Sequence, residues 1–286
     1  MRVLLINPPD DLRAFLGGGS AFISTVEPLG LLYIAAVARE AGHEVSVIDA
    51  FAEDLDEQAL FERLERLQPD VVGLTTLTSN GGFVYRFGQL LRKRRPGMTV
   101  VLGNLHASVF ADAYLRNGAC DFVVHGEGEH VFLGLLEVLG THDAPDSVPS
   151  LSFLRDGQPV RTSGPASVRD LDSLPFPARD LAPQHLYRVN EISNERTRGL
   201  KAGVATKHMM SSRGCPNRCT FCVQVNSPPR YLAAQRTVDE MELLSSRYGA
   251  GLIQFSDPLF TGKRQRVLDI CREVRSRRLD VRWHCE

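Results

Sequence analysis

The hydrophobic positions of the first half of the chain alternate between short apolar runs and longer segments with apolar residues three or four positions apart. Short runs predict buried strands, and the longer segments predict amphipathic helices. Strands are expected at residues 2–6, 44–48, 70–76, 98–103 and 121–125, and helices at 28–42, 55–67, 83–95, 108–117 and 129–139. Five successive strand–helix units predict an α/β fold with a doubly wound, parallel, five-stranded Rossmann-like sheet.

The second half repeats the alternation after a segment of different character. Residues 150–162 predict a β-hairpin that turns at Asp156-Gly157, and the prolines of 171–181 indicate a domain boundary. From residue 201, strand, helix, strand, helix and the start of a third strand resemble the first units of a βα (TIM-like) barrel. Because so few units cannot close a barrel, the chain is expected to be truncated or one half of a split protein.

These patterns predict three regions with different roles. Residues 1–140 are expected to form a ligand-binding Rossmann-like domain, 141–200 a linker with a hairpin, and 201–286 an incomplete barrel domain. Ligands of open parallel sheets bind at the carboxyl ends of the strands, where this sequence has loops rich in glycine and hydroxyl side chains. The GxGxxG fingerprint is absent after the first strand, which counts against a nicotinamide or flavin site.

Composition excludes several other classes of protein. Hydrophobic residues make up 43% and charged residues 23%, as in ordinary globular proteins. The net charge of −1 provides no overall field that would attract nucleic acid. No apolar run approaches the roughly 18–20 residues of a membrane helix, and six cysteines are too few for a disulfide scaffold. We therefore expect a cytoplasmic protein with neither nucleic acid nor membrane as partner.

Three closely spaced cysteines carry the most specific chemistry. Cys215, Cys219 and Cys222 have the spacing C-x3-C-x2-C. Three thiolates can ligate three irons of a cubane cluster and leave the fourth iron open. A structural zinc site is the alternative, but it usually needs a second cysteine pair or a histidine pair, and neither is present.

The segment RGCPNRCTFC (213–222) resembles the signature of radical S-adenosylmethionine enzymes. Further segments resemble the cobalamin-binding branch of that superfamily: NPP after the first strand, EPLGLLYIAAVAREAGHEV, GNLHAS, HGEGE and LPFPARDL. The resemblance implies a 4Fe–4S cluster on the three cysteines, S-adenosylmethionine chelated by the open iron, and cobalamin bound to the N-terminal domain.

The resemblance also implies ligand contacts for individual residues. Phe221 would border the adenine, or else be a loop aromatic packed on the barrel rim. Asp257 would lie near the methionine moiety, or else cap the following loop. The expected cobalamin contacts are Asn7, Pro8, Pro28, Leu29, Gly30, Thr75, Thr76, Thr78, Ser79, Gly103, Asn104, His106, Ser108, Gly126 and Glu127.

Histidine ligation of cobalt and the role of Glu127 need separate consideration. The stretch at residues 7–18 has no histidine, so cobalt is expected to receive no histidine ligand from it. His106 is interpreted as a hydrogen-bond donor in preference to a metal ligand. Glu127 and Glu129 could cap the last helix of the domain instead of touching a ligand.

The implied activity is methyl transfer to an unactivated carbon through a 5′-deoxyadenosyl radical and methylcobalamin. A cyclase or ring-rearrangement enzyme with the same cofactors is the first alternative. A cobalamin- and cluster-binding module without turnover, and a zinc-stabilised regulator, are the others. The expected partners are a small-molecule substrate, an electron donor such as a flavodoxin or ferredoxin, and the remaining half of the barrel.

Overall fold

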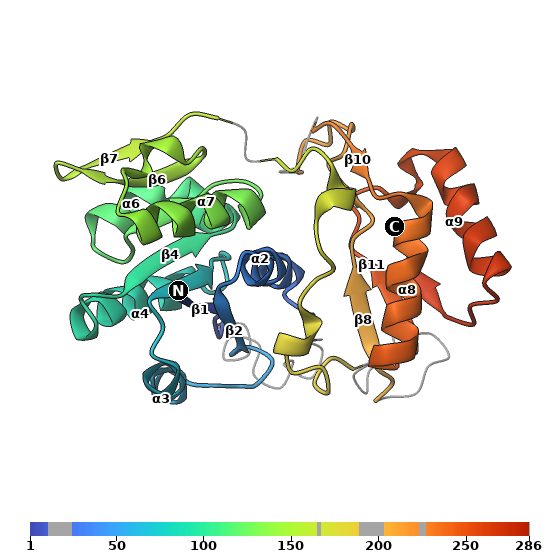
Figure 1. The fold of residues 1–286 in the computed structure, drawn as a ribbon, viewed down its shortest axis with the longest axis horizontal. Helices are drawn as coiled ribbons and strands as arrows, with labels where there is room; N and C mark the ends of the chain where they lie inside the picture. Colours follow the sequence, from blue (N-terminus) through green and yellow to red (C-terminus); the bar gives the residue numbers. More distant parts are fainter. Residues whose placement is uncertain (11–24, 165–166, 189–202, 223–226, 286) are drawn as a thin grey trace. The chain divides into compact units, whose positions relative to one another are not determined.

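A computed structural model describes residues 1–10, 25–164, 167–188, 203–222 and 227–285 (Figure 1). The chain divides into two compact units. Unit 1 comprises Met1–Ser20, Gly30–Val168 and Pro177–Pro183, and unit 2 comprises Ala21–Leu29, Arg169–Phe176 and Gln184–Glu286. Within the described residues, no helix has both the length and the hydropathy needed to cross a membrane.

The sheet of unit 1 begins with the five parallel strands that the sequence predicts. Their spatial order is β2-β1-β3-β4-β5, so the strand order reverses between β1 and β3. Such a switch point is where ligands of open α/β sheets bind. The strands are β1 (Arg2–Asn7), β2 (Glu44–Asp49), β3 (Val71–Thr75), β4 (Thr99–Gly103) and β5 (Phe122–Val124).

The prediction of a purely parallel, five-stranded sheet is wrong at one edge. The hairpin of β6 (Leu151–Arg155) and β7 (Gln158–Arg161) pairs antiparallel with β5, which gives seven strands in the described part of unit 1. The pairing covers the otherwise open backbone edge of β5 and brings Phe122 against Phe153. Asp156 and Gly157 form the predicted turn, with φ of 50° and 74°.

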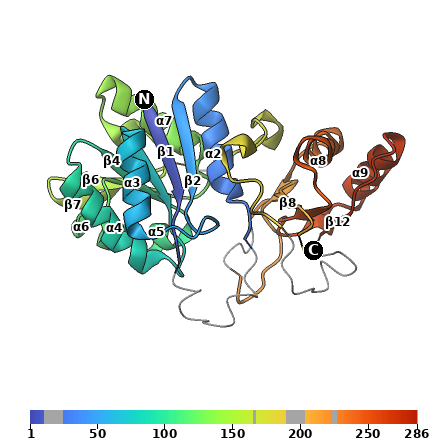
Figure 2. The ribbon, with the colours of Figure 1, turned by 90° about the horizontal axis from the view of Figure 1, so that it is seen from below.

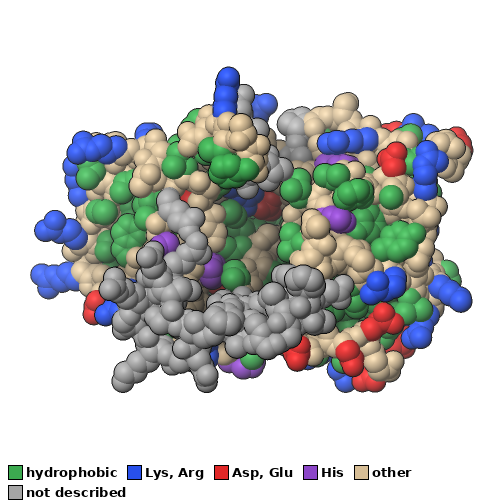
Figure 3. Space-filling model, turned by 180° about the vertical axis from the view of Figure 1, so that it is seen from behind, with side chains coloured by type: hydrophobic (Ala, Val, Ile, Leu, Met, Phe, Trp, Pro, Cys, Tyr) green, Lys and Arg blue, Asp and Glu red, His purple; other side chains and the backbone are tan. Residues whose placement is uncertain are grey.

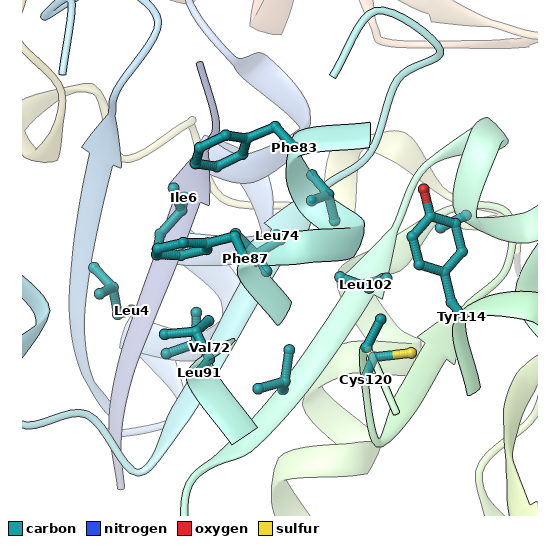
Figure 4. Packing of buried hydrophobic residues seen from close by; sticks show 14 of the residues in the cluster. Leu4, Ile6, Val72, Leu74, Phe83, Phe87, Leu91, Leu102, Tyr114 and Cys120 are labelled. Carbon is teal, nitrogen blue, oxygen red and sulfur yellow. The ribbon is translucent and has the colours of Figure 1, made fainter. Parts of the chain in front are cut away.

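Helices cover both faces of this sheet (Figures 1 and 2). One face buries a cluster with Phe83, Phe87 and Leu91, which pack on Leu4 and Ile6 of β1 (Figure 4). Val3 and Leu5, on the opposite face of β1, belong to a second cluster that also contains residues of the helices at 29–40 and 128–141. The larger helices are α2 (Leu29–Glu40), α3 (Glu57–Leu67), α4 (Gly81–Arg94) and α7 (Gly128–Thr141).

The helix predicted at 108–117 is two shorter helices that begin earlier. They are α5 (Leu105–Val109) and α6 (Ala111–Arg116), which meet at Phe110. The first begins early because the Asn104 side chain accepts a hydrogen bond from the Leu105 N–H at 2.7 Å. The loop after β4 is therefore shorter than the sequence indicates, and it lies closer to the strand end.

Unit 2 contains the beginning of the predicted βα repeat. In its described part, β8 (Thr206–Met209), β11 (Leu252–Phe255) and β12 (Trp283–His284) form a parallel sheet with β11 in the middle. Helices α8 (Ala234–Tyr248) and α9 (Arg264–Ser276) follow the first and second of these strands and pack on them through one core cluster. A short antiparallel pair, β9 (Ser212–Arg213) and β10 (Arg230–Tyr231), flanks the cysteine loop.

Candidate functional site

The loops after β3 and β4 are joined by side-chain hydrogen bonds. Asn104 Nδ2 donates to Thr75 Oγ1 at 3.1 Å, and Thr78 Oγ1 lies 3.3 Å from His106 Nδ1. The Thr76 N–H donates to the Gly103 carbonyl at 2.9 Å. The structure therefore brings the two predicted ligand-binding loops together at the carboxyl edge of the sheet.

Thr76 provides the clearest sign of an unfilled interaction at this edge. Its side chain is fully buried, and its hydroxyl has no hydrogen-bond partner among the described residues. Leaving such a group unpaired costs about 1–3 kcal/mol, so it requires a reason. A ligand group that binds at this edge would supply the missing partner, which makes Thr76 fit the predicted contact.

Asn104 adopts a backbone conformation that is rare for residues other than glycine. Its φ is 79° and its ψ is 175°. Strain of this kind is worth about 1–3 kcal/mol and concentrates at ligand-binding and catalytic sites. The two hydrogen bonds of its side chain, to Leu105 and Thr75, hold this conformation.

The His106 ring is held by its surroundings. It packs 4.6 Å from the Phe110 ring, and Nε2 lies 2.6 Å from the position that a Cβ on Gly81 would occupy. A side chain at position 81 would therefore displace the ring. With Nδ1 directed at Thr78, this arrangement favours a hydrogen-bonding role over a metal-ligand role.

Other predicted contacts make protein–protein hydrogen bonds. Asn7 Nδ2 donates to the buried Asp49 carboxylate at 2.7 Å, and Ser108 Oγ donates to the Asn104 carbonyl at 3.0 Å. Pro8 is buried and Ser79 is half-buried. Residues 11–18 of the histidine-free stretch lie outside the described residues.

The expected contacts around residue 28 fall at the division between the units. Pro28 and the buried Leu29 belong to unit 2, whereas the exposed Gly30 belongs to unit 1. The assignment of this segment to the cobalamin site therefore stays a prediction.

In the loop after β5, Glu127 does not cap the following helix through its side chain, as the alternative interpretation expected. Gly126 has a φ of 72°, and Glu127 follows at the N-cap position of α7 without a side-chain capping hydrogen bond. Instead, Glu127 Oε2 accepts a hydrogen bond from the Val168 N–H at 2.6 Å. The Glu127 carboxylate thus ties residues beyond the hairpin to this loop.

The sequence did not single out His125, the residue before Gly126. It is buried, its Nε2 lies 2.8 Å from Ser152 Oγ, and its Nδ1 has no hydrogen-bond partner among the described residues. Burial, with a smaller contribution from the Arg161 charge, lowers the pKa of His125 to about 4. The available signal was its place at the start of the HGEGE segment, in which only Gly126 and the glutamates were singled out.

The three clustered cysteines lie on one loop of unit 2, between β9 and β10. None is in a disulfide bond; Cys219 is exposed, and Cys215 and Cys222 are half-buried. Ser227 holds the start of the loop, because its N–H donates to the Cys215 carbonyl and its Oγ accepts from the Cys215 N–H, both at 3.0 Å. Accessible thiols on a short loop suit iron or another thiophilic metal.

The described residues do not form a finished metal site. No group of three or more His, Cys, Asp or Glu side chains among them is arranged to hold a metal ion. The donor set therefore fits a cluster by its chemistry and spacing, while its convergence on one metal group stays a prediction.

Phe221 and Asp257 have contrasting environments. Phe221 is 91% exposed, so it packs on little of the described structure. Asp257 is buried and accepts hydrogen bonds from the Ser211 N–H and from the hydroxyls of Ser211 and Ser212. Its carboxylate therefore binds the segment before the cysteine loop, and not the loop that follows β11.

Comparisons with known proteins agree with this architecture. Residues 20–136 match the B12 binding domain family. The chain is 31% identical, over 99% of its length, to a Pyrococcus horikoshii protein described as an uncharacterized methyltransferase. A solved structure of the cobalamin-dependent S-adenosylmethionine radical enzyme OxsB covers 99% of the chain with a TM-score of 0.79 at 18% identity. The sequence match therefore covers a B12 binding domain, and the likeness to OxsB shows the fold of the chain.

Another relative has a different named activity. The anaerobic magnesium-protoporphyrin IX monomethyl ester cyclase of Rubrivivax gelatinosus is 28% identical over 99% of the chain. The chain spans 59% of the Pyrococcus protein, 50% of the cyclase and 38% of the OxsB chain. The chain therefore spans about half the length, or less, of the relatives it matches.

Proposed function

We propose that the chain is the cobalamin-binding and cluster-binding part of a radical S-adenosylmethionine methyltransferase that acts on an unactivated carbon. One observation carries the proposal. The C-x3-C-x2-C thiols lie on one loop directly after the first parallel strand of unit 2, in a chain whose residues 20–136 match the B12 binding domain family. The methyltransferase name of the Pyrococcus relative supports the reaction type.

The proposal gives each cofactor a place among the residues of the chain. Cys215, Cys219 and Cys222 would hold the 4Fe–4S cluster, and the exposed Phe221 ring would be available to the adenine of S-adenosylmethionine. The joined loops after β3 and β4 would hold cobalamin. When bound, these groups supply a carbon-centred radical and a methyl carrier.

The protein's own contribution at the cobalamin edge is positioning. The Thr76 hydroxyl has a hydrogen bond to offer, and the Asn104 conformation brings backbone groups to the strand end. His106 packs on Phe110 and hydrogen-bonds with Thr78, so its role would be to hold the loop and not to ligate cobalt. We propose a small-molecule substrate, a flavodoxin-like or ferredoxin-like electron donor, and a reducing cytoplasm as the setting for the six thiols.

The first test is anaerobic reconstitution with iron, sulfide, S-adenosylmethionine and a strong reductant. We expect the protein to form 5′-deoxyadenosine, and we expect Cys219→Ala to abolish this because one iron loses its thiolate. Cys271→Ala, which removes a cysteine of α9, is the matched control and should retain the product. Equal product from Cys219→Ala and the unchanged protein would exclude the proposed cluster site.

A cyclase or rearrangement activity is the second candidate, because relatives matching 99% of the chain carry a cyclase name. The two reactions leave different products from S-adenosylmethionine. A methyltransferase forms S-adenosylhomocysteine together with 5′-deoxyadenosine, whereas a cyclase forms only the latter. A persistent cobalamin spectrum with neither product would instead favour a binding module without turnover.

A further inference from the structure

A buried ion pair lies beneath the cysteine loop in unit 2. Asp257 follows β11, and Arg266 lies in the first turn of α9, with Nη2 3.7 Å from Asp257 Oδ2. The two side chains are 0% and 5% exposed. Burying both charges is costly unless further hydrogen bonds satisfy them, so the partners of this pair indicate its role.

The hydrogen-bond donors to Asp257 are all in the segment that leads into the loop. Oδ1 accepts from the Ser211 N–H at 2.7 Å, and Oδ2 accepts from the hydroxyls of Ser211 and Ser212 at 2.7 and 2.6 Å. Ser212 begins β9, and Cys215 follows three residues later. The carboxylate thus fixes the backbone just before the first cluster cysteine.

Arg266 contacts both ends of the same loop. Its Nη2 donates to the Ser211 carbonyl at 2.9 Å and also contacts Ser211 Oγ. Its guanidinium lies 5.2 Å from the centre of the Tyr231 ring. Tyr231 of β10 pairs with Ser212 of β9. Arg266 therefore contacts Ser211, directly before the strand that enters the loop, and lies over Tyr231 of the strand that leaves it.

The entry to the loop is also sterically fixed. Gly214 has a φ of 84°, and a Cβ there would lie 2.4 Å from the Pro228 carbonyl oxygen. The two ends of the loop therefore approach closely, directly beside Cys215. Only Arg213 and Gly214 separate Ser212 from Cys215, so a shift of Ser212 would be passed directly to the first cysteine.

We propose that Asp257 and Arg266 are positioning residues that hold the base of the cysteine loop, so that Cys215, Cys219 and Cys222 are placed to ligate the cluster. The inference rests on the proposed function and changes the expected role of Asp257. Three hydrogen bonds and an ion pair engage its carboxylate, so holding the loop accounts for Asp257 without a direct contact with S-adenosylmethionine.

The test compares Asp257→Asn and Ser212→Ala with controls from the surface of the same unit. Asp269→Asn removes a carboxylate from an exposed Asp–Arg pair in α9, and Ser246→Ala removes an exposed hydroxyl in α8. Each protein is reconstituted anaerobically, and bound iron, sulfide and the EPR spectrum of the reduced cluster are measured before and after S-adenosylmethionine is added.

The positioning role predicts an effect before any S-adenosylmethionine is present. Asp257→Asn should lose most of its bound iron or show a changed EPR spectrum, Ser212→Ala should show a smaller change, and both controls should match the unchanged protein. If Asp257→Asn has normal iron and a normal spectrum, and loses only the response to S-adenosylmethionine, Asp257 contacts that ligand and the proposal is wrong. If Asp257→Asn does not fold, Ser212→Ala decides between the two results.

A measurement on the metal-free chain separates this inference from the proposed function. Hydrogen–deuterium exchange should be faster at residues 211–215 and 230–231 in Asp257→Asn and Ser212→Ala than in the controls. If the two variants exchange faster but the unchanged protein binds no cluster, the proposed function is wrong and the positioning role of Asp257 still holds. If exchange in Ser212→Ala is the same as in the unchanged protein, the positioning role is wrong, whatever the metal content.

Discussion

At the scale of single residues, the candidate cobalamin edge is defined by groups that ordinary folding would avoid. Thr76 buries a hydroxyl without a partner among the described residues, and Asn104 holds a positive φ. Each costs free energy in the metal- and ligand-free chain. That both occur on adjoining loops at one strand edge is the strongest local argument for a ligand there.

Among the described glycines, Gly88 of α4 leaves the least room for a side chain. A Cβ at this position would lie 2.0 Å from the Ala119 carbonyl oxygen. We expect Gly88→Ala to lower the free energy of unfolding by about 3 kcal/mol, because the backbone has to move. Urea denaturation should show this loss. Gly82→Ala in the same helix, whose nearest atom would be 3.6 Å away, should be tolerated, and equal stability of the two variants would contradict the argument.

His125 predicts a pH dependence of stability. Its pKa is lowered to about 4 in the folded chain, against 6.5 as the ordinary value, so the unfolded chain binds the proton more readily. The contribution of neutral His125 to the free energy of unfolding is therefore complete above about pH 6.5. It is lost as the pH falls towards 4, by up to about 1.4 kcal/mol per pH unit. Thermal unfolding of His125→Gln between pH 5 and 7.5 should show a weaker dependence than that of the unchanged protein. His130→Gln, at an exposed position of α7, should keep the original slope.

At the scale of elements, helix ends and strand ends set the loops that form the site. Helix α3 begins after Asp56, whose Oδ1 accepts from the Ala59 N–H at 2.8 Å, and it buries Leu60, Phe61 and Leu64 against the sheet. The same kind of cap at Asn104 starts α5 and shortens the loop after β4. Capping side chains therefore determine where the ligand-facing loops begin and end.

The cap of α3 offers a direct measurement of this effect. We expect Asp56→Ala to lower the free energy of unfolding by about 1 kcal/mol, because the Ala59 N–H loses its acceptor. Asp56→Ser, which retains a capping oxygen, should restore most of the loss in the same denaturation experiment. A loss of the same size in both variants would assign the effect to charge instead of capping.

At the scale of the whole molecule, the local hydrophobic pattern predicts the repeated strand–helix units, but it does not predict which distant segments and side chains pair with each other. The strands at 2–6 and 98–103 and the βα order of residues 201–286 follow from hydrophobic spacing, and the structure agrees with them. The pairing of β6 with β5 does not follow from hydrophobic spacing, because a hairpin sequence does not indicate which strand edge it will join. The hydrogen bonds from Val168 to Glu127 and from Ser211 to Asp257 span more than forty residues, which no periodicity reveals.

The added hairpin also determines whether the edge of the sheet can pair with a strand of another chain. Residues that flank a two-residue turn exchange hydrogen bonds, so Arg155 and Gln158 form such a pair, and Pro159 falls at the next pair, opposite Leu154. There its nitrogen faces away from β6, on the side that a strand from another chain would approach, and it has no hydrogen to donate. With Arg161 at the end of the same strand, this margin of the sheet resists intermolecular strand addition and the aggregation that such addition begins.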